Sequence, residues 1–232
     1  TIFLTGVIDM KIGISIVHYG EQSLLNNCLK SLEIVPYNEQ FKVEVFNCNE
    51  NNIGFSAGNN ILIQEYLRYG FPNDELVSPK IDWFWLLNND TTVPKETLDA
   101  IPKVLESLDS KIGIVGFKIL SMDSPDLIHH AGTGRCFPAG EHKSGSVKLK
   151  QFAKRTQERW VTFASVLVRR EVFEKIGLLD EKMVNYGSDS DFCYRARAAG
   201  FKIIYEPSFV IHHKIGSSQN PNKNQQKIIQ SD

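Results

Sequence analysis

The segment that decides the fold is Ile81-Asp82-Trp83-Phe84-Trp85-Leu86-Leu87-Asn88-Asn89-Asp90-Thr91. The wholly apolar run 83–87 is typical of a strand that is buried on both faces of a sheet. Polar residues follow at once, and Pro94 then opens a helical pattern with an apolar stripe. In open α/β sheets, ligands bind beyond the carboxyl ends of the strands. This stretch therefore predicts an α/β protein with a ligand site after residue 87.

The rest of the chain repeats the alternation of strand and helix. Further strands are expected at 12–17, 41–46, 112–117, 160–168, 202–206 and 209–213. Helices are expected at 21–32, 57–69, 94–108 with a kink at Pro102, 170–176 and 188–199. We therefore expect a mostly parallel central sheet with flanking helices. Residues 121–159 lack periodicity, and their basic part is either a solvated loop or a basic rim beside an anionic substrate.

Composition excludes several classes of protein. The 232 residues carry 26 Lys+Arg against 27 Asp+Glu, which excludes a strongly basic protein that coats nucleic acid. No apolar stretch approaches the roughly 20 residues of a membrane span. The four cysteines form no CxxC pair, and Cys28 and Cys193 lie in apolar helical patterns, which favours buried, reduced thiols and a reducing compartment. We expect one domain over 11–213, an extension at 1–10 and a polar tail at 214–232.

Two acidic segments are candidate sites. In Asn88-Asn89-Asp90, a carboxylate among amides suits a hard divalent cation that also binds phosphate oxygens, although Asn and Asp also favour ordinary turns. In Ser188-Asp189-Ser190-Asp191, Ser188 and Asp191 have the spacing of a capping box at a helix start. Asp189 would then lie at the first helical position, where its carboxylate is able to take a proton from a hydroxyl.

Two further segments are less distinctive. The segment 51–60 places glycines before a helix, which permits close approach of a ligand, but it matches neither a Walker loop nor GxGxxG. His212-His213 ends the last predicted strand. Because adjacent strand residues face opposite sides, only one of the two is able to face a given cleft.

Taken in order, these segments resemble family 2 glycosyltransferases of the GT-A fold, especially the branch with rhamnosyl- and galactofuranosyltransferases. The matching stretches are Ile14-Ser15-Ile16-Val17-His18-Tyr19-Gly20, Cys28-Leu29-Lys30-Ser31-Leu32, Asn52-Ile53-Gly54-Phe55-Ser56-Ala57-Gly58-Asn59-Asn60, Leu86-Leu87-Asn88-Asn89-Asp90-Thr91, Trp160 through Arg169-Arg170-Glu171-Val172-Phe173, Ile176-Gly177-Leu178-Leu179-Asp180-Glu181, Asp189-Ser190-Asp191-Phe192-Cys193 and Val210-Ile211-His212-His213. The resemblance covers most of 11–213 and implies a Rossmann-like nucleotide-binding half plus an acceptor half.

The resemblance also implies an activity and roles for residues. It implies inverting transfer of a sugar from a nucleotide-diphosphate donor to an acceptor hydroxyl, with Mn²⁺ or Mg²⁺ as cofactor. Asp90 matches the metal ligand of the DXD position, His212 the histidine that completes the metal site in some relatives, and Asp189 the general base. The residues expected to flank the nucleotide are His18, Tyr19, Asn47, Gly54, Asn59 and Asn88, and those expected on the acceptor side are Trp160, Phe163 and Asp191.

The expected acceptor is a saccharide or lipid-linked saccharide in cell-surface polysaccharide synthesis, with the enzyme in the cytoplasm or at the inner face of the plasma membrane. The chain also departs from the family pattern. Ser188 replaces a Glu, Phe163 stands where Gly is preferred, and Asn88 removes one carboxylate. The segment after 45–47 lacks the helix and third strand of relatives, together with the Asp that contacts the nucleobase. Sugar-phosphate nucleotidyl transfer and a degenerate sugar-binding or scaffold protein are the alternative hypotheses.

Overall fold

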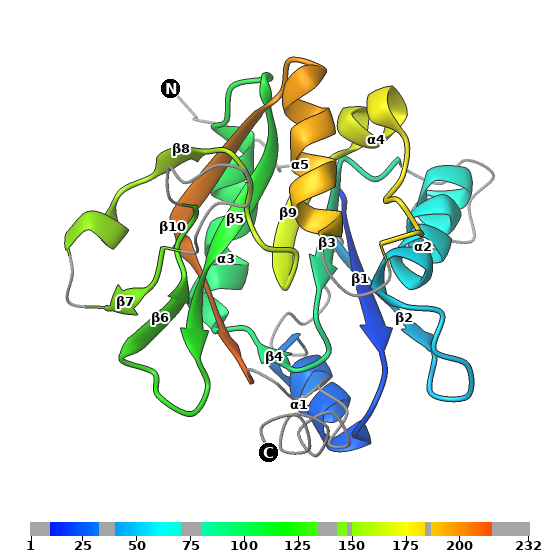
Figure 1. Cartoon of the computed structure of the whole chain (residues 1–232), viewed down its shortest axis with the longest axis horizontal. Coiled ribbons are helices and arrows are strands. Elements are labelled where there is room, and N and C mark those ends of the chain that lie inside the picture. Colours follow the sequence, from blue (N-terminus) through cyan, green and yellow to red (C-terminus); the bar gives the residue numbers. More distant parts are fainter. Residues whose placement is uncertain are drawn as a thin grey trace, which may run out of the picture.

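The structure is a computed structural model that describes residues 10–32, 40–70, 80–133, 143–147, 150–183 and 187–214. Its strands are β1 (Ile12–His18), β2 (Phe41–Asn47), β3 (Trp83–Leu87), β4 (Thr91–Thr92), β5 (Ile112–Ser121), β6 (Leu127–His130), β7 (Gly145–Ser146), β8 (Thr156–Glu158), β9 (Ser165–Arg169) and β10 (Lys202–His213). Its helices are α1 (Gln22–Leu32), α2 (Phe55–Tyr69), α3 (Lys95–Glu106), the 3-10 helix η1 (Lys150–Ala153), α4 (Arg170–Ile176) and α5 (Ser188–Ala198). The α/β class predicted from the sequence is confirmed (Figure 1).

One sheet runs through the protein in the order β2-β1-β3-β9-β5-β10-β4. Strand β1 is parallel to β2 and β3, and β5 is parallel to β10. Strand β9 lies between these two parallel groups and is antiparallel to both β3 and β5. The expectation of a mostly parallel sheet is therefore corrected to a mixed sheet, because β9 enters the centre in the reverse direction.

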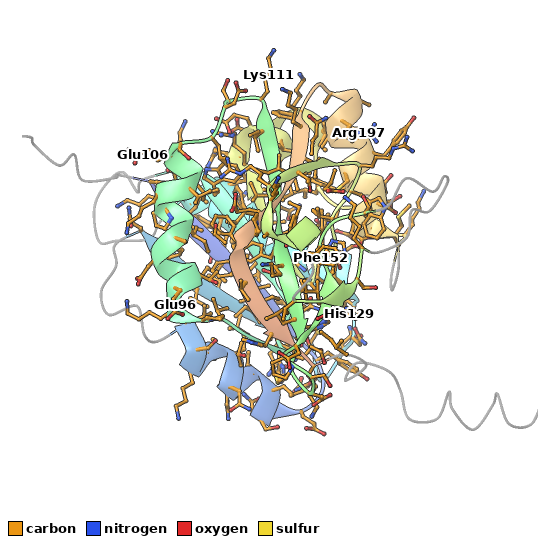
Figure 2. The ribbon with its side chains drawn as sticks, turned by 90° about the vertical axis from the view of Figure 1, so that its left-hand side faces the viewer. Glu96, Glu106, Lys111, His129, Phe152 and Arg197 are labelled. Atoms are coloured by element: carbon orange, nitrogen blue, oxygen red, sulfur yellow. The ribbon has the colours of Figure 1, made fainter. Side chains whose placement is uncertain are left out.

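Helices cover both faces of the sheet, as the two-sided burial of β3 requires. Alternate residues of β3 divide between the faces: Trp83 and Trp85 pack with α1 and α3, whereas Phe84 and Leu86 pack with α2, α4 and α5. Figure 1 shows α5 in front of the sheet and α3 behind it. Figure 2, turned by 90°, shows α3 from the side along its whole length, with Glu96 and Glu106 near its two ends. All five residues of β3 are buried, so the apolar run is accounted for by two layers of helices.

Several local expectations are corrected. Strand β9 begins at Ser165 rather than at residue 160, and the two strands expected at 202–213 form one strand with a register shift between Glu206 and Val210. The segment expected to be a loop over 121–159 contributes β6, β7, β8 and η1. These elements have two to four residues each, too few for a periodic pattern to show in the sequence.

The two-residue strand β4 determines where the site lies. Three residues separate β3 from β4, in which Thr91 and Thr92 pair antiparallel with His213 and His212 at the end of β10. The chain therefore connects β3 to the far edge of the sheet, although β9, β5 and β10 lie between them in the order of strands. Within the described residues, no helix has the length and apolar character needed to cross a membrane.

Candidate active site

The turn Asn88–Asp90 is fixed by hydrogen bonds from α1, from β4 and to the segment before β9. The Cys28 thiol donates to the Asn88 carbonyl at 3.7 Å, and the Thr91 hydroxyl donates to the same carbonyl at 2.7 Å. The Asn88 N–H donates to the carbonyl of Ala164 at 3.0 Å, which joins the turn to the segment before β9. Burial raises the pKa of Cys28 to about 11, so this thiol is a neutral packing group and not a nucleophile.

Asp90 and His213 meet at this turn. The Asp90 side chain is 3% exposed, and its Oδ1 lies 3.0 Å from Nε2 of His213. The β4–β10 pairing accounts for this contact, and the backbone N–H of Lys214 also donates to the Asp90 carbonyl at 2.9 Å. The sequence assigned the metal-partner role to His212, but the structure places the ring of His213 beside Asp90. His212 is the preceding residue of the same strand and therefore faces the other side.

His18 is fully buried at the end of β1. Its Nδ1 lies 2.9 Å from the Asn89 side-chain nitrogen, and its Nε2 lies 3.1 Å from that of Asn49. Burial lowers the pKa of His18, which favours the neutral ring. His18, expected to flank a nucleotide, therefore lies behind the surface, while the adjacent Tyr19 is 47% exposed. From the sequence, Asn49 has no assigned role, and Asn89 is named only as part of the 88–90 motif.

The start of α2 lies next to this edge. Gly54 precedes the helix with φ of 88°, a conformation that favours glycine, and its N–H donates to the side chain of Asn52 at 3.0 Å. Gly58 serves packing, because a Cβ there would lie 2.8 Å from the methyl carbons of Val17. Asn59 is buried and donates to the Phe55 carbonyl at 3.0 Å, so it braces the first turn of α2. Asn47 ends β2 as an exposed residue and accepts from the Asn49 N–H at 3.0 Å.

Asp189 lies in the first turn of α5. The helix is preceded by Gly187 with φ of 92°, and Ser188 is buried, so the predicted Ser188 cap is wrong: the left-handed glycine makes the turn instead. Oδ1 of Asp189 accepts from the Ser190 N–H at 2.7 Å. Burial raises the pKa of Cys193, one turn further along α5, and the Asp189 carboxylate raises it further. Asp189 lies four residues before the fully buried Cys193, and this spacing places the two on the same side of α5.

The three residues expected on the acceptor side have different surroundings. Phe163 is 3% exposed and packs edge-on against Phe192 of α5, with ring centroids 5.8 Å apart. Asp191 accepts from Arg195 at 2.8 Å, and Arg195 also donates to the carbonyls of Ile176, the last residue of α4, and of Leu178. Phe163 and Asp191 thus support α5. The half-buried Trp160 lies with its ring centroid 6.0 Å from that of His130.

The segment 121–159 adds two features to this region. The exposed His129 of β6 has its ring centroid 6.5 Å from that of His213, at the lower end of β10 in Figure 2. Two of the basic residues pair with buried carboxylates, Lys143 with Glu158 at 2.6 Å and Arg155 with Glu206 at 2.5 Å. These pairs anchor the segment to β8 and β10, so the basic character of the region is smaller than its sequence indicates.

This fold recurs in known proteins. A GT-A arrangement is shared with solved glycosyltransferases: the structure of GalNAc-T7 with UDP, GalNAc and Mn²⁺ has a TM-score of 0.61 at 15% identity, over 91% of this chain and 45% of that one. Residues 1–349 of TarS from S. aureus give a TM-score of 0.57 at 12% identity, over 88% of this chain and 60% of that one. The profile described as "Glycosyltransferase like family 2" matches residues 36–231, and the chain belongs to this family of glycosyltransferases.

Two curated proteins resemble part of the chain. The O-antigen biosynthesis protein RfbC of Myxococcus xanthus is 31% identical over 141 residues, and the uncharacterized protein y4gI of Sinorhizobium fredii is 30% identical over 119 residues. These matches cover 56% and 47% of this chain but only 11% and 12% of the two relatives. The chain therefore corresponds to a small part of the proteins it matches.

Proposed function

We propose that this domain transfers a sugar from a nucleoside-diphosphate donor to a saccharide hydroxyl with inversion, using a divalent cation bound at Asp90 and His213 and Asp189 as the base. The observation that carries the proposal is the pair formed by Asp90 and His213, 3.0 Å apart at the carboxyl edge of the sheet. Around this pair lie the end of β3, the end of β10 and the segment before β9.

The residues present fit a small divalent cation that keeps other ligands. Oδ1 of Asp90 and Nε2 of His213 lie 3.0 Å apart, so a carboxylate oxygen and an imidazole nitrogen would together hold the cation. Across the described residues, no three His, Cys, Asp or Glu side chains form a metal cluster. Waters and phosphate oxygens of the donor would complete the coordination, which is the usual state of Mg²⁺ in such sites. A cation held there by Asp90 and His213 would neutralise the charge that develops on the leaving diphosphate.

Asp189, in the first turn of α5, is the proposed proton acceptor. Single displacement needs one base that takes the proton of the attacking hydroxyl, and it needs no second carboxylate as nucleophile. The Ser190 N–H donates to Oδ1 of Asp189. This hydrogen bond fixes the orientation of the carboxylate, and with it the direction of the second oxygen, Oδ2. Phe163 packs on Phe192 of the same helix turn and holds that turn against the sheet.

The substrate class is supported by two named relatives. RfbC is an O-antigen biosynthesis protein, and GalNAc-T7 was solved with UDP, GalNAc and Mn²⁺. We infer for this chain a nucleotide-sugar donor and a role in cell-surface polysaccharide assembly, with a saccharide or lipid-linked saccharide as acceptor. Rhamnose is the proposed sugar, on the resemblance of the motifs to the rhamnosyltransferase branch.

Calorimetry with a panel of donors tests the proposal. The panel contains dTDP-rhamnose, UDP-galactofuranose, UDP-GlcNAc and GDP-mannose, each titrated with and without MnCl₂. We expect one donor to bind more tightly with Mn²⁺, and we expect Asp90→Asn to remove this gain. The control Asp99→Asn removes an exposed carboxylate of α3 that pairs with Lys95 and should bind as wild type does. Binding of no donor under either condition would overturn the proposal and favour a degenerate protein.

The stereochemistry is tested separately. With the donor that binds, NMR of the product gives the anomeric configuration of the new bond. We expect it to be opposite to that of the donor, because a single displacement inverts the carbon that is attacked. Retention would exclude Asp189 as the sole catalytic carboxylate.

A further inference from the structure

The His18 ring connects the ends of three strands. His18 is the last residue of β1, Asn49 follows β2, and Asn89 follows β3. The Asn89 side-chain nitrogen lies 2.9 Å from Nδ1 of His18 and also donates to the Tyr19 carbonyl at 3.2 Å. With Nδ1 as the acceptor, the two hydrogens of this amide serve Tyr19 and Nδ1, and the Asn49 nitrogen beside Nε2, itself a donor, makes no hydrogen bond to the ring. Each edge of the ring thus has one neighbour, Asn89 on one side and Asn49 on the other.

Asn89 lies between Asn88 and Asp90 in the turn that carries the proposed cation ligand. Its side chain is the part of this turn that reaches back to β1, whereas Asn88 is fixed through its backbone by Thr91 and Ala164. The Asn89 side chain is buried, so its bonds to His18 and Tyr19 are not exchanged for water at the surface. Rotation of Asn89 would turn the following residue, Asp90, relative to His213.

We propose that His18 is a positioning residue: through Nδ1 it holds Asn89, and thereby sets the orientation of Asp90 toward the cation. The inference rests on the proposed function for the role of Asp90, but its structural part concerns the turn alone. Groups that orient metal ligands from behind typically affect metal affinity by about 10- to 100-fold when they are replaced. His18 itself is fully buried and is not expected to touch the donor.

Two isosteric variants separate positioning from simple burial of a ring. The amide of Asn occupies the position of the Nδ1 edge, so His18→Asn keeps an acceptor for Asn89. The amide of Gln occupies the position of the Nε2 edge, so His18→Gln keeps the contact with Asn49 and loses the one with Asn89. The backbone carbonyl of His18, which accepts from the Cys48 N–H at 2.9 Å, is the same in both variants.

The control replaces another buried histidine of the same region. His130 is 1% exposed, and its Nε2 accepts from the Thr162 N–H at 3.3 Å. His130→Gln therefore removes a buried ring near the site without touching Asn89.

The experiment measures Mn²⁺ binding by electron paramagnetic resonance and amide hydrogen exchange of the peptide that contains 88–91. We expect His18→Gln to weaken Mn²⁺ binding about 10- to 100-fold and to speed exchange in this peptide, while His18→Asn and His130→Gln stay close to wild type. Equal behaviour of His18→Asn and His18→Gln, or an equal loss in His130→Gln, would overturn the inference.

Failure of the proposed function has a different signature. If the wild-type chain binds no Mn²⁺, the cation site is wrong, and exchange of the 88–91 peptide alone decides the inference. Faster exchange in His18→Gln but not in His18→Asn then still shows that the ring holds the turn. Unchanged exchange in both variants shows that it does not.

Discussion

Replacing Asp189 by Asn is expected to stop sugar transfer while the protein stays folded. In the wild-type chain the Ser190 N–H lies 2.7 Å from Oδ1 of Asp189. Asn keeps an oxygen at this position, so the first turn of α5 keeps its hydrogen bond. Loss of the negative charge at the helix start costs about 0.3–1 kcal/mol of stability. Loss of a general base slows the reaction by about 10²–10⁴-fold, which corresponds to about 2.7–5.4 kcal/mol in the activation free energy.

Asp191 provides the matched control, two residues away in the same helix turn. Its carboxylate pairs with Arg195 at 2.8 Å, and both side chains are about a quarter exposed, at 25% and 29%. Asp191→Asn loses this ion pair and the negative charge at the helix start, which together lower the free energy of unfolding by about 1 kcal/mol. We expect its melting temperature to fall by about 2–4 °C and the transfer rate of its folded fraction to stay near wild type.

The assay is release of nucleoside diphosphate in the presence of acceptor, with thermal unfolding of each variant measured in parallel. Asp189→Asn must be slow and stable, and Asp191→Asn must be active and less stable. Transfer by Asp189→Asn within tenfold of the wild-type rate would refute the assignment of the base. Equal loss of activity in both variants would show that the charge of the helix start matters, and not the position of one carboxylate.

Three further predictions concern the cation, pH and the segment 121–159. His213→Ala should weaken Mn²⁺ binding about tenfold or more, whereas His212→Ala should not; titration of both decides which ring is the ligand, and equal losses would contradict the geometry. Because burial lowers the pKa of His18, the unfolded chain binds this proton more readily, so stability is complete above pH 6.5, the ordinary pKa, and falls as the pH drops below it. Urea unfolding of wild type and His18→Asn from pH 7.5 to 5 should show a steeper loss in wild type, and parallel curves would argue against it. Glu158→Gln should cost about 2–4 kcal/mol in urea unfolding, because the buried carboxylate accepts from Lys143, Thr133 and Thr156, while Glu174→Gln on the surface should cost under about 0.5 kcal/mol. Equal costs for the two would contradict the prediction.

Elements with a strong local pattern were predictable from the sequence. Continuous apolar runs predict strands β1 and β3, and apolar residues at helical spacing predict helices α1, α2 and α4. Gly177 ends α4 as expected. The order of motifs identified the family, which the profile match confirms. The direction of β9 was not predicted, because nothing in the sequence of a strand shows whether it runs parallel or antiparallel to its neighbours.

The parts of the site that depend on distant pairing were not predictable. Strand β4 has two residues, and only its pairing with β10 shows that His213, and not His212, lies beside Asp90. The roles of Asn89 and Asn49 depend on a ring between them, so neither has a local signal. Ser188 has the spacing of a cap, but Gly187 adopts the left-handed turn and Ser188 is buried instead. These outcomes follow from tertiary contacts that override local preference.

The pairing of β4 with β10 closes a ring of strands. From β3 the hydrogen-bonded path runs through β9, β5 and β10 to β4, and residues 88–90 return it covalently to β3. The strands on either side of β9 are therefore joined twice, once through the sheet and once through the turn that carries Asp90. They cannot swing apart as two independent bodies unless the short Thr91–His213 and Thr92–His212 pairing breaks. Any motion that opens this edge must therefore break the strand pairing that holds Asp90 beside His213.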